Sequence, residues 1–121
     1  MFIHYFKKLR INSQSIIFLR YHSSNKNFGK KIFHKALIKN NVDTVFGISG
    51  GSIMPLIDSF YDSKIKLIVN SNEQCVGHSA TGYSKTSNKV GIAMVTSGPG
   101  ITNMITPLLD ATNDSTPLIV F

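Results

Sequence analysis

The chain has 121 residues, a formal net charge of +7 at pH 7 and one cysteine, Cys75. This length allows one domain, the lone cysteine excludes an internal disulfide, and no apolar run reaches the ~20 residues of a membrane-spanning helix. The charge is uneven, because residues 1–42 hold nine Lys/Arg and no acids, whereas residues 43–121 hold four Lys/Arg and six acids. The basic charge therefore belongs to a leading segment, and a nucleic-acid-binding function for the whole chain is not indicated.

Residues 1–24 mix bulky apolar residues with Lys, Arg, Ser and Asn. This composition is typical of an organellar transit peptide, and we expect cleavage near residues 20–24 (RYHSS). The short apolar run at residues 15–19 argues against a secretory signal. The expected location is the mitochondrion, with the plastid as an alternative. Two other interpretations remain open: a disordered basic tail on a cytoplasmic protein, and a nucleic-acid-binding arm in which aromatic and basic residues interleave.

After residue 30, the hydrophobic pattern predicts strands that alternate with helices. The expected helices span residues 30–40, 52–60, 73–85 and 101–113, and the expected strands span residues 44–48, 66–70, 89–96 and 117–121. Strands separated by helices predict an α/β fold: a three-layer parallel sheet with flanking helices. Because no helix follows the last strand to cover it, we expect residues 30–121 to be a domain that is incomplete at its C-terminus.

Local signals refine these boundaries. Asn40 or Asn41 is expected to end the first helix in a left-handed conformation. Ser52 is expected to cap the second helix, with Pro55 tolerated in its first turn.

Three predicted turns follow strands and so lie at the carboxyl edge of the sheet, where open parallel sheets bind ligands. They are residues 49–51 (SGG), 70–73 (NSNE) and 97–100 (SGPG). Two are rich in glycine, which lets the backbone approach a ligand closely. The third presents Glu73. The pattern thus indicates a carboxylate between two permissive loops, although turn geometry alone would also explain the glycines.

Other catalytic motifs are missing from the sequence. There is no P-loop, the SGPG turn lacks the G-x-G-x-x-G spacing, and Ser97 is not in a G-x-S-x-G elbow. No His/Cys set has metal-ligand spacing, so no metal ligands are expected. We expect His78 to be structural and Cys75 to be a small buried thiol. Four acids in or near helices are expected to be solvated, capping or interface groups: Asp58, Asp62, Asp110 and Asp114.

Three stretches together resemble a known family: residues 45–60 (VFGISGGSIMPLIDSF), 72–85 (NEQCVGHSATGYSK) and 89–120 (KVGIAMVTSGPGITNMITPLLDATNDSTPLIV). They resemble the N-terminal, pyrimidine-binding domain of thiamine-diphosphate enzymes over residues 30–121. The SGPG-x-TN block followed by P-x-x-DA-x-x-DS-x-P is specific when both occur in this order. The GGSIMPL-x-D stretch favours the acetolactate synthase (acetohydroxyacid synthase) catalytic subunit within that superfamily.

The resemblance implies a transferase that condenses pyruvate with a second 2-keto acid, with loss of CO2, in the biosynthesis of isoleucine and valine. Two alternatives remain open: another thiamine-diphosphate-dependent decarboxylase or oxidase, and a truncated, non-catalytic chain. The isolated 121 residues are expected to be inactive, because the family active site lies between two subunits of a homodimer or tetramer. Mg²⁺ and an optional FAD would bind through parts not present in this chain. A regulatory subunit is optional, and neither nucleic acid nor a membrane is an implied partner.

The resemblance assigns Glu73 as the catalytic acid–base. The matching family glutamate hydrogen-bonds N1′ of the cofactor's aminopyrimidine and thereby helps thiazolium C2 to lose its proton. The residues that match cofactor-binding positions are Glu73, Gly50, Gly51, Pro99, Gly100, Asn103 and Gln74.

The chain departs from the family pattern around this glutamate. Asn72 replaces a histidine, Cys75 and Val76 replace small residues, and Thr81 replaces a glutamate. Ser52 stands where alanine is usual. These differences leave Glu73 in place and concern the packing around it.

Overall fold

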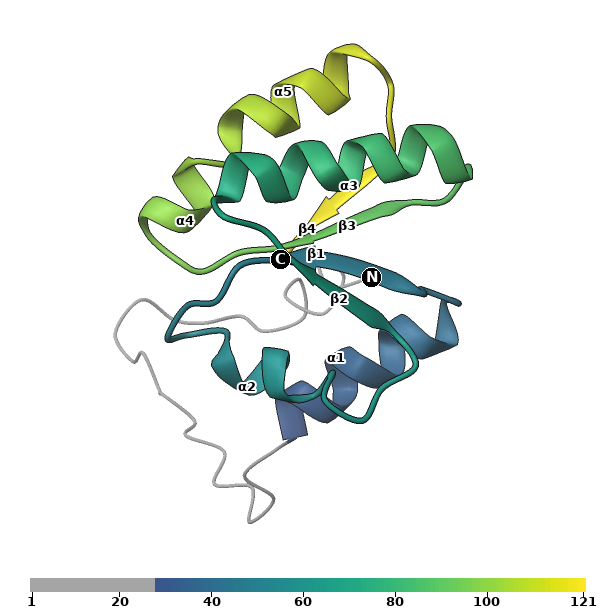
Figure 1. Ribbon diagram of the computed structural model, residues 1–121, viewed down its shortest axis with the longest axis vertical. Helices are drawn as coiled ribbons and strands as arrows, with labels where there is room; N and C mark the ends of the chain where they lie inside the picture. Colours follow the sequence, from purple (N-terminus) through teal and green to yellow (C-terminus); the bar gives the residue numbers. More distant parts are fainter. Residues whose placement is uncertain (1–27) are drawn as a thin grey trace, which may run out of the picture.

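The computed structural model describes residues 28–121 (Figure 1). The expected transit peptide, residues 1–24, lies outside this range. In chain order the elements are α1 (Phe28–Lys39), β1 (Thr44–Gly47), α2 (Met54–Asp58), β2 (Lys66–Val69), α3 (Glu73–Ser87), β3 (Gly91–Met94), α4 (Pro99–Thr102), α5 (Ile105–Asn113) and β4 (Leu118–Val120). None of the helices within residues 28–121 combines the length and the apolar character that crossing a bilayer requires.

The four strands form one parallel sheet in the order β2-β1-β3-β4. Helices α1 and α2 lie on one face, and α3, α4 and α5 lie on the other (Figure 1), which confirms the predicted three-layer α/β fold. The chain passes from β1 outward to β2, and α3 then carries it back to β3 on the other side of β1. The strand order therefore reverses between β1 and β3. At such a switch point the loops beyond the strands diverge and leave a crevice for a ligand.

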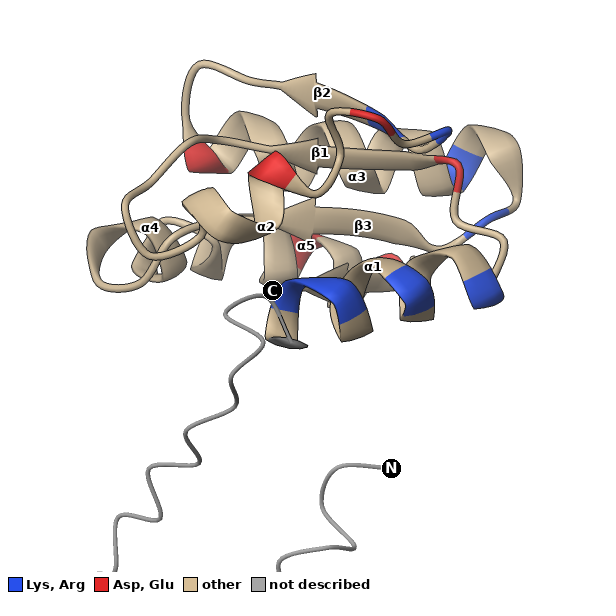
Figure 2. Cartoon of the chain, turned by 90° about the horizontal axis from the view of Figure 1, so that it is seen from below, with Lys and Arg blue, Asp and Glu red and all other residues tan. Residues whose placement is uncertain are grey.

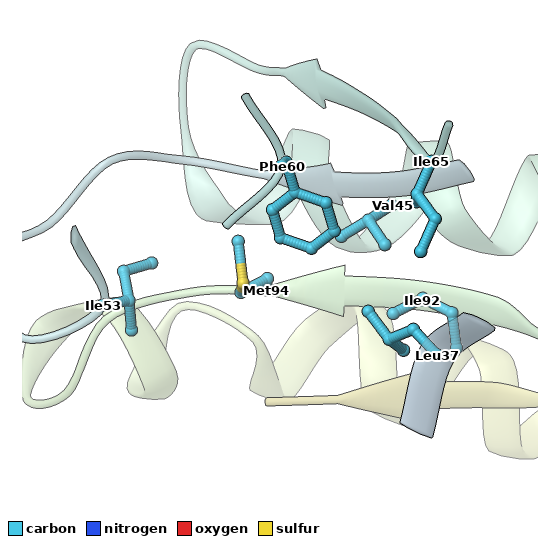
Figure 3. Packing of buried hydrophobic residues seen from close by; sticks show 7 residues of the cluster. All are labelled: Leu37, Val45, Ile53, Phe60, Ile65, Ile92 and Met94. Atoms are coloured by element: carbon cyan, nitrogen blue, oxygen red, sulfur yellow. The ribbon is translucent and has the colours of Figure 1, made fainter. Parts of the chain in front are cut away.

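Two hydrophobic cores cover the two faces of the sheet, because successive strand side chains point to opposite sides. One core joins the central strands to α1 and to the segment around α2, as Figure 3 shows: Leu37, Val45, Ile53, Phe60, Ile65, Ile92 and Met94. The other core joins the central strands to α3 and to the residue before α5: Phe46, Val76, Ala80, Ala93, Val95 and Met104. Strands β1 and β3 are thus buried on both faces, as expected for the centre of a parallel sheet.

Several predicted boundaries are confirmed. Asn41 has a φ of 55° and ends α1 in the left-handed conformation. Asn88, for which no prediction was made, ends α3 in the same way, with a φ of 57°. Pro55 lies in the first turn of α2, where its missing N–H costs no helical hydrogen bond.

The predicted cap of α2 is wrong. The N-cap residue is Ile53, which makes no side-chain capping bond. Residues 50–53 instead form a tight turn, in which the Ile53 N–H donates to the Gly50 carbonyl at 3.2 Å. Ser52 therefore lies before the helix, and its hydroxyl bonds to Thr96.

The helix predicted over residues 101–113 is two helices, α4 and α5. Two features separate them. After Thr102 the Met104 N–H bonds to the Ile101 carbonyl, three residues back, which tightens and ends α4. The Asn103 carbonyl also has no donor four residues on, because Pro107 lacks an N–H. In addition, β3 spans four residues, whereas residues 89–96 were predicted.

Charged side chains lie at the surface of the described residues. The lysines of α1 form a basic row along that helix (Figure 2). Lys30 bonds to Asp58 at 2.5 Å and joins α1 to α2, while Lys85 bonds to Asp114 at 2.5 Å. The four aspartates expected to be solvated, capping or interface groups are all exposed.

Candidate functional site

Two loops meet at the carboxyl ends of β1 and β3, and Thr96 lies between them. The Thr96 and Ser52 hydroxyls are 2.8 Å apart. A Cβ added to Gly50 would lie 2.4 Å from the Thr96 Cβ, and one added to Gly100 would lie 2.8 Å from its Cγ2. Only glycine allows both approaches. The two glycine-rich turns therefore close around one threonine at the switch point of the sheet.

Glu73 is the first residue of α3, because Asn72 begins the helix. The Asn72 side chain accepts a hydrogen bond from the Cys75 N–H at 2.8 Å, as an N-cap residue does. Glu73 thus sits where the dipole of the 15-residue helix favours a negative charge. Its side chain is partly exposed, so the carboxylate is accessible at the rim.

One of the two oxygens of the Glu73 carboxylate is held by a side-chain hydrogen bond. Its Oε2 accepts a hydrogen bond from the Asn103 Nδ2 at 3.0 Å. Its Oε1 lies beside Gly100, where an added Cβ would be 3.6 Å away. Because Gly100 has no side chain, it leaves space next to Oε1 that a larger residue would fill. The site therefore has one oxygen fixed by an amide and a second oxygen next to a glycine.

The pairing of Glu73 with Asn103 depends on how closely α3 and α5 pack. A Cβ added to Gly77 would lie 2.3 Å from the Cβ of Pro107. Gly77 is four residues after Glu73, and Pro107 is four residues after Asn103. The same close approach thus brings the two polar side chains within hydrogen-bond distance.

A separate depression lies at the opposite, amino edge of the sheet. It has a volume of about 310 Å³ and is lined by residues 40–44 and 88–90 together with Tyr83. In it, Lys89 and Tyr83 both donate hydrogen bonds to Asp43. Lys89 holds the pKa of Asp43 well below its ordinary value of 3.8, with a further contribution from Tyr83. This depression is far from the carboxyl edge, so it is not part of the Glu73 site.

Some of the residues predicted to form the site come together and others do not. Glu73, Gly100 and Asn103 are neighbours, and Gly50 meets the group through Thr96. Three other predicted residues lie on the same loops or helix starts but are exposed: Gly51, Gln74 and Pro99.

The sequence analysis missed Thr96. It was treated as the end of the strand over residues 89–96, although β3 ends at Met94. The available signal was a hydroxyl directly before a glycine-rich turn at the ligand edge.

The burial predicted for Cys75 is wrong, because this residue is exposed. The buried stripe of α3 consists of Val76, Gly77, Ala80, Thr81 and Ser84, and Cys75 lies off that stripe. His78 is also at the surface, and its Nδ1 is 3.6 Å from the Asp110 Oδ2. His78 thus bridges α3 and α5, which suits a structural role. Within residues 28–121, no three His, Cys, Asp or Glu side chains cluster as metal ligands.

Comparison with known proteins matches this chain to one family. The profile of the N-terminal TPP binding domain of thiamine pyrophosphate enzymes matches residues 28–121. The chain belongs to this family. The acetolactate synthase of Schizosaccharomyces pombe, which is mitochondrial, is 49% identical over 94 residues, covering 77% of this chain and 14% of the relative. The mitochondrial acetolactate synthase catalytic subunit of Saccharomyces cerevisiae is 46% identical over 94 residues, which again cover 77% of this chain and 14% of the relative.

A bacterial relative, the acetolactate synthase large subunit of Corynebacterium glutamicum, is 44% identical over 92 residues, covering 75% of this chain and 15% of the relative. The chain therefore spans about one seventh of the length of these relatives.

The family's cofactor can be tested against the residues present. The family resemblance implies that a glutamate hydrogen-bonds the aminopyrimidine of thiamine pyrophosphate, close to backbone that the ring can approach. The rim of this sheet offers both, since Glu73 Oε1 lies beside the side-chain-free Gly100. Because a Cβ at Gly100 would fill part of this space, the geometry fits the pyrimidine end of the cofactor.

The departures from the family pattern are accommodated by the packing. Val76 is fully buried in the core under α3. Thr81 is also buried, and its hydroxyl donates to the Gly77 carbonyl at 2.9 Å, so the buried polar group is satisfied within the helix. Asn72 caps α3. Each of these three residues thus has a defined packing or hydrogen-bonding role in α3.

Proposed function

We propose that this chain supplies the aminopyrimidine-binding part of a thiamine-diphosphate-dependent acetolactate synthase. The reaction would condense pyruvate with a second 2-keto acid and release CO2, in branched-chain amino acid biosynthesis. The family match and the names of the relatives support the reaction class. The observation that carries the proposal is the Glu73 carboxylate, which is fixed by Asn103 at the switch point of the sheet.

Glu73 would act as the acid–base of the site. Its Oε1 would bond to N1′ of the aminopyrimidine, and Asn103 would hold the carboxylate plane through Oε2. Thiamine diphosphate, when bound, supplies the carbon centre that adds to the keto acid and the electron sink for the charge left by CO2. The protein's part is to position the ring and to exchange a proton with it, and a correctly placed group of this kind contributes roughly 10²–10⁴ in rate.

The two glycine-rich turns would line the cofactor. Gly50 and Gly51 follow β1 and would face the reacting end, while Pro99 and Gly100 begin α4 and would flank the pyrimidine. Gln74, the second residue of α3, would complete this set. The close packing of Gly50 and Gly100 on Thr96 supports a rigid wall for the site.

The other half of the site would come from elsewhere. We propose that Mg²⁺ and the diphosphate bind to a partner subunit in a homodimer or tetramer, with FAD and a regulatory subunit as optional components.

The proposed location is the mitochondrion. The basic, acid-free segment of residues 1–42 supports it, as do the names of the two fungal relatives. Residues 1–24 would be the transit peptide and residues 30–121 the pyrimidine-binding domain.

A chimera tests the proposal. Residues 28–121 would replace the matched segment of the S. pombe enzyme, and product analysis with pyruvate would separate acetolactate from acetaldehyde and acetyl phosphate. We expect acetolactate, and we expect Glu73→Gln to lower kcat by roughly 10²–10⁴. Asp62→Asn is the matched control, since it also turns a carboxylate into an amide but lies at an exposed position after α2. Near-normal turnover by the Glu73→Gln chimera would refute the role of Glu73, and acetaldehyde or acetyl phosphate as the product would refute the reaction.

A further inference from the structure

We propose that Thr96 is the positioning residue of this site: its hydroxyl fixes the loop between β1 and α2, and its methyl fixes the start of α4 and hence Asn103. The inference deepens the proposed function, because the two elements that Thr96 holds are the ones that would enclose the cofactor. It rests on the contacts of one partly buried side chain with two loops that are distant in sequence.

The hydroxyl contact links Thr96 to the first loop. The Ser52 hydroxyl lies 2.8 Å from it, across a sequence separation of 44 residues. Gly50 packs against the same side chain, since an added Cβ would come within 2.4–2.9 Å of three Thr96 atoms. The Gly50–Ile53 turn is thus pressed against Thr96 at one end and bonded to it at the other. This contact needs a hydroxyl at position 52.

The methyl contact links Thr96 to the second loop. A Cβ on Gly100 would lie 2.8 Å from the Thr96 Cγ2. Gly100 is in the single turn of α4, and the Asn103 N–H donates to the Pro99 carbonyl at 3.1 Å in that turn. A shift of Gly100 therefore moves Asn103, and Asn103 holds the Glu73 carboxylate. The branched side chain of threonine serves both loops, because its Cγ2 packs near both Gly50 and Gly100, whereas its hydroxyl faces only the loop of Gly50 and Ser52.

Two conservative variants separate the two contacts. Thr96→Val keeps the shape and removes the hydroxyl, whereas Thr96→Ser keeps the hydroxyl and removes the methyl. Ser52→Ala removes the same hydrogen bond from the exposed partner. Thr112→Val is the matched control, because its hydroxyl bonds to the Leu108 carbonyl within α5.

The experiment uses NMR on the full 121-residue chain without any ligand. The first readout is hydrogen exchange of the Ile53 amide, which reports the first loop. The second readout is the Asn103 side-chain amide resonance, whose chemical shift follows protonation of the Glu73 carboxylate. We expect Thr96→Val and Ser52→Ala to speed Ile53 exchange about tenfold, the scale of one net hydrogen bond, and to leave the Asn103 response unchanged.

The Thr96→Ser variant should give the opposite pattern. Ile53 exchange should stay near the wild-type rate, while the response of the Asn103 amide to Glu73 protonation should shrink. A general loss of stability would move both readouts together in every variant, and that result would overturn the proposal. If Thr96→Val does not fold, Ser52→Ala tests the same bond from the surface, and unchanged Ile53 exchange in Ser52→Ala overturns the role of the hydroxyl.

These readouts are independent of catalysis. Failure of the chimera to make acetolactate would refute the proposed function and leave the NMR result standing. An active chimera together with unchanged NMR readouts in the 121-residue variants would refute the positioning role alone.

Discussion

The contact between α3 and α5 makes a sharp prediction for Gly77→Ala. In an isolated helix this change would stabilise by roughly 1 kcal/mol, because alanine has the higher helix propensity. In this structure the new Cβ would lie 2.3 Å from the Pro107 Cβ, 2.6 Å from its Cγ and 2.8 Å from the Met104 Cε. The proline ring cannot rotate away, so the helices must separate.

Overpacking of a core typically costs about 1–3 kcal/mol, and contacts this short belong at or beyond the upper end of that range. After the gain in helix propensity, we expect Gly77→Ala to lower the free energy of unfolding by about 2 kcal/mol. For a domain of this size that corresponds to a fall in Tm of roughly 8–16 °C. Thermal and urea unfolding followed by circular dichroism would measure both quantities.

The matched control is Gly82→Ala on the same helix. An added Cβ there meets no atom within 4 Å, so only the propensity gain applies. We expect this variant to be more stable than wild type by about 0.5–1 kcal/mol. If Gly77→Ala proves as stable as Gly82→Ala, the packing of α3 on α5 is not as described, and the distance between Glu73 and Asn103 loses its structural basis.

Three further predictions concern other parts of the chain. Asp43→Asn should destabilise by less than about 1 kcal/mol at neutral pH, because the pair with Lys89 is exposed. The folded-state pKa of Asp43 lies below its ordinary value of 3.8, so the extra stability of the wild type over Asp43→Asn is present above that pH and should shrink as the pH falls below it. Urea unfolding at several pH values would reveal this trend, and a stability difference that stays constant with pH would contradict it. Asn72→Ala removes the cap of α3 and should cost about 1 kcal/mol, whereas an unchanged urea midpoint would show that the cap contributes nothing. Deletion of residues 1–24 should abolish mitochondrial import of a fluorescent fusion and leave the circular dichroism spectrum intact, and import without those residues would refute the transit peptide.

Much of the architecture could be predicted because it follows from local patterns. The alternation of strand and helix comes from hydrophobic periodicity, and Glu73 was placed at the ligand edge because it ends the short turn of residues 70–73 that follows a strand. The split between α4 and α5 was not predicted, because the hydrophobic pattern of residues 101–113 fits one continuous helix.

Contacts between segments that are distant along the chain could not be predicted from the sequence. The pairing of Glu73 with Asn103 depends on how closely two helices approach, and a glycine in a helix does not reveal its partner. Thr96 was overlooked for the same reason, since its role depends on two loops that meet only in the folded chain. The burial of Cys75 was predicted from its residue type, whereas its place on α3, directly before the buried stripe that begins at Val76, leaves it exposed.

The central claim is that Glu73 exchanges a proton with the bound aminopyrimidine. The most direct test is the rate at which the thiazolium C2 proton of thiamine diphosphate exchanges with deuterated solvent in the chimera, before and after Glu73→Gln. We predict that exchange slows by roughly 10²–10⁴ in the variant, at equal occupancy of the cofactor. Equal exchange rates in the two proteins would contradict the account.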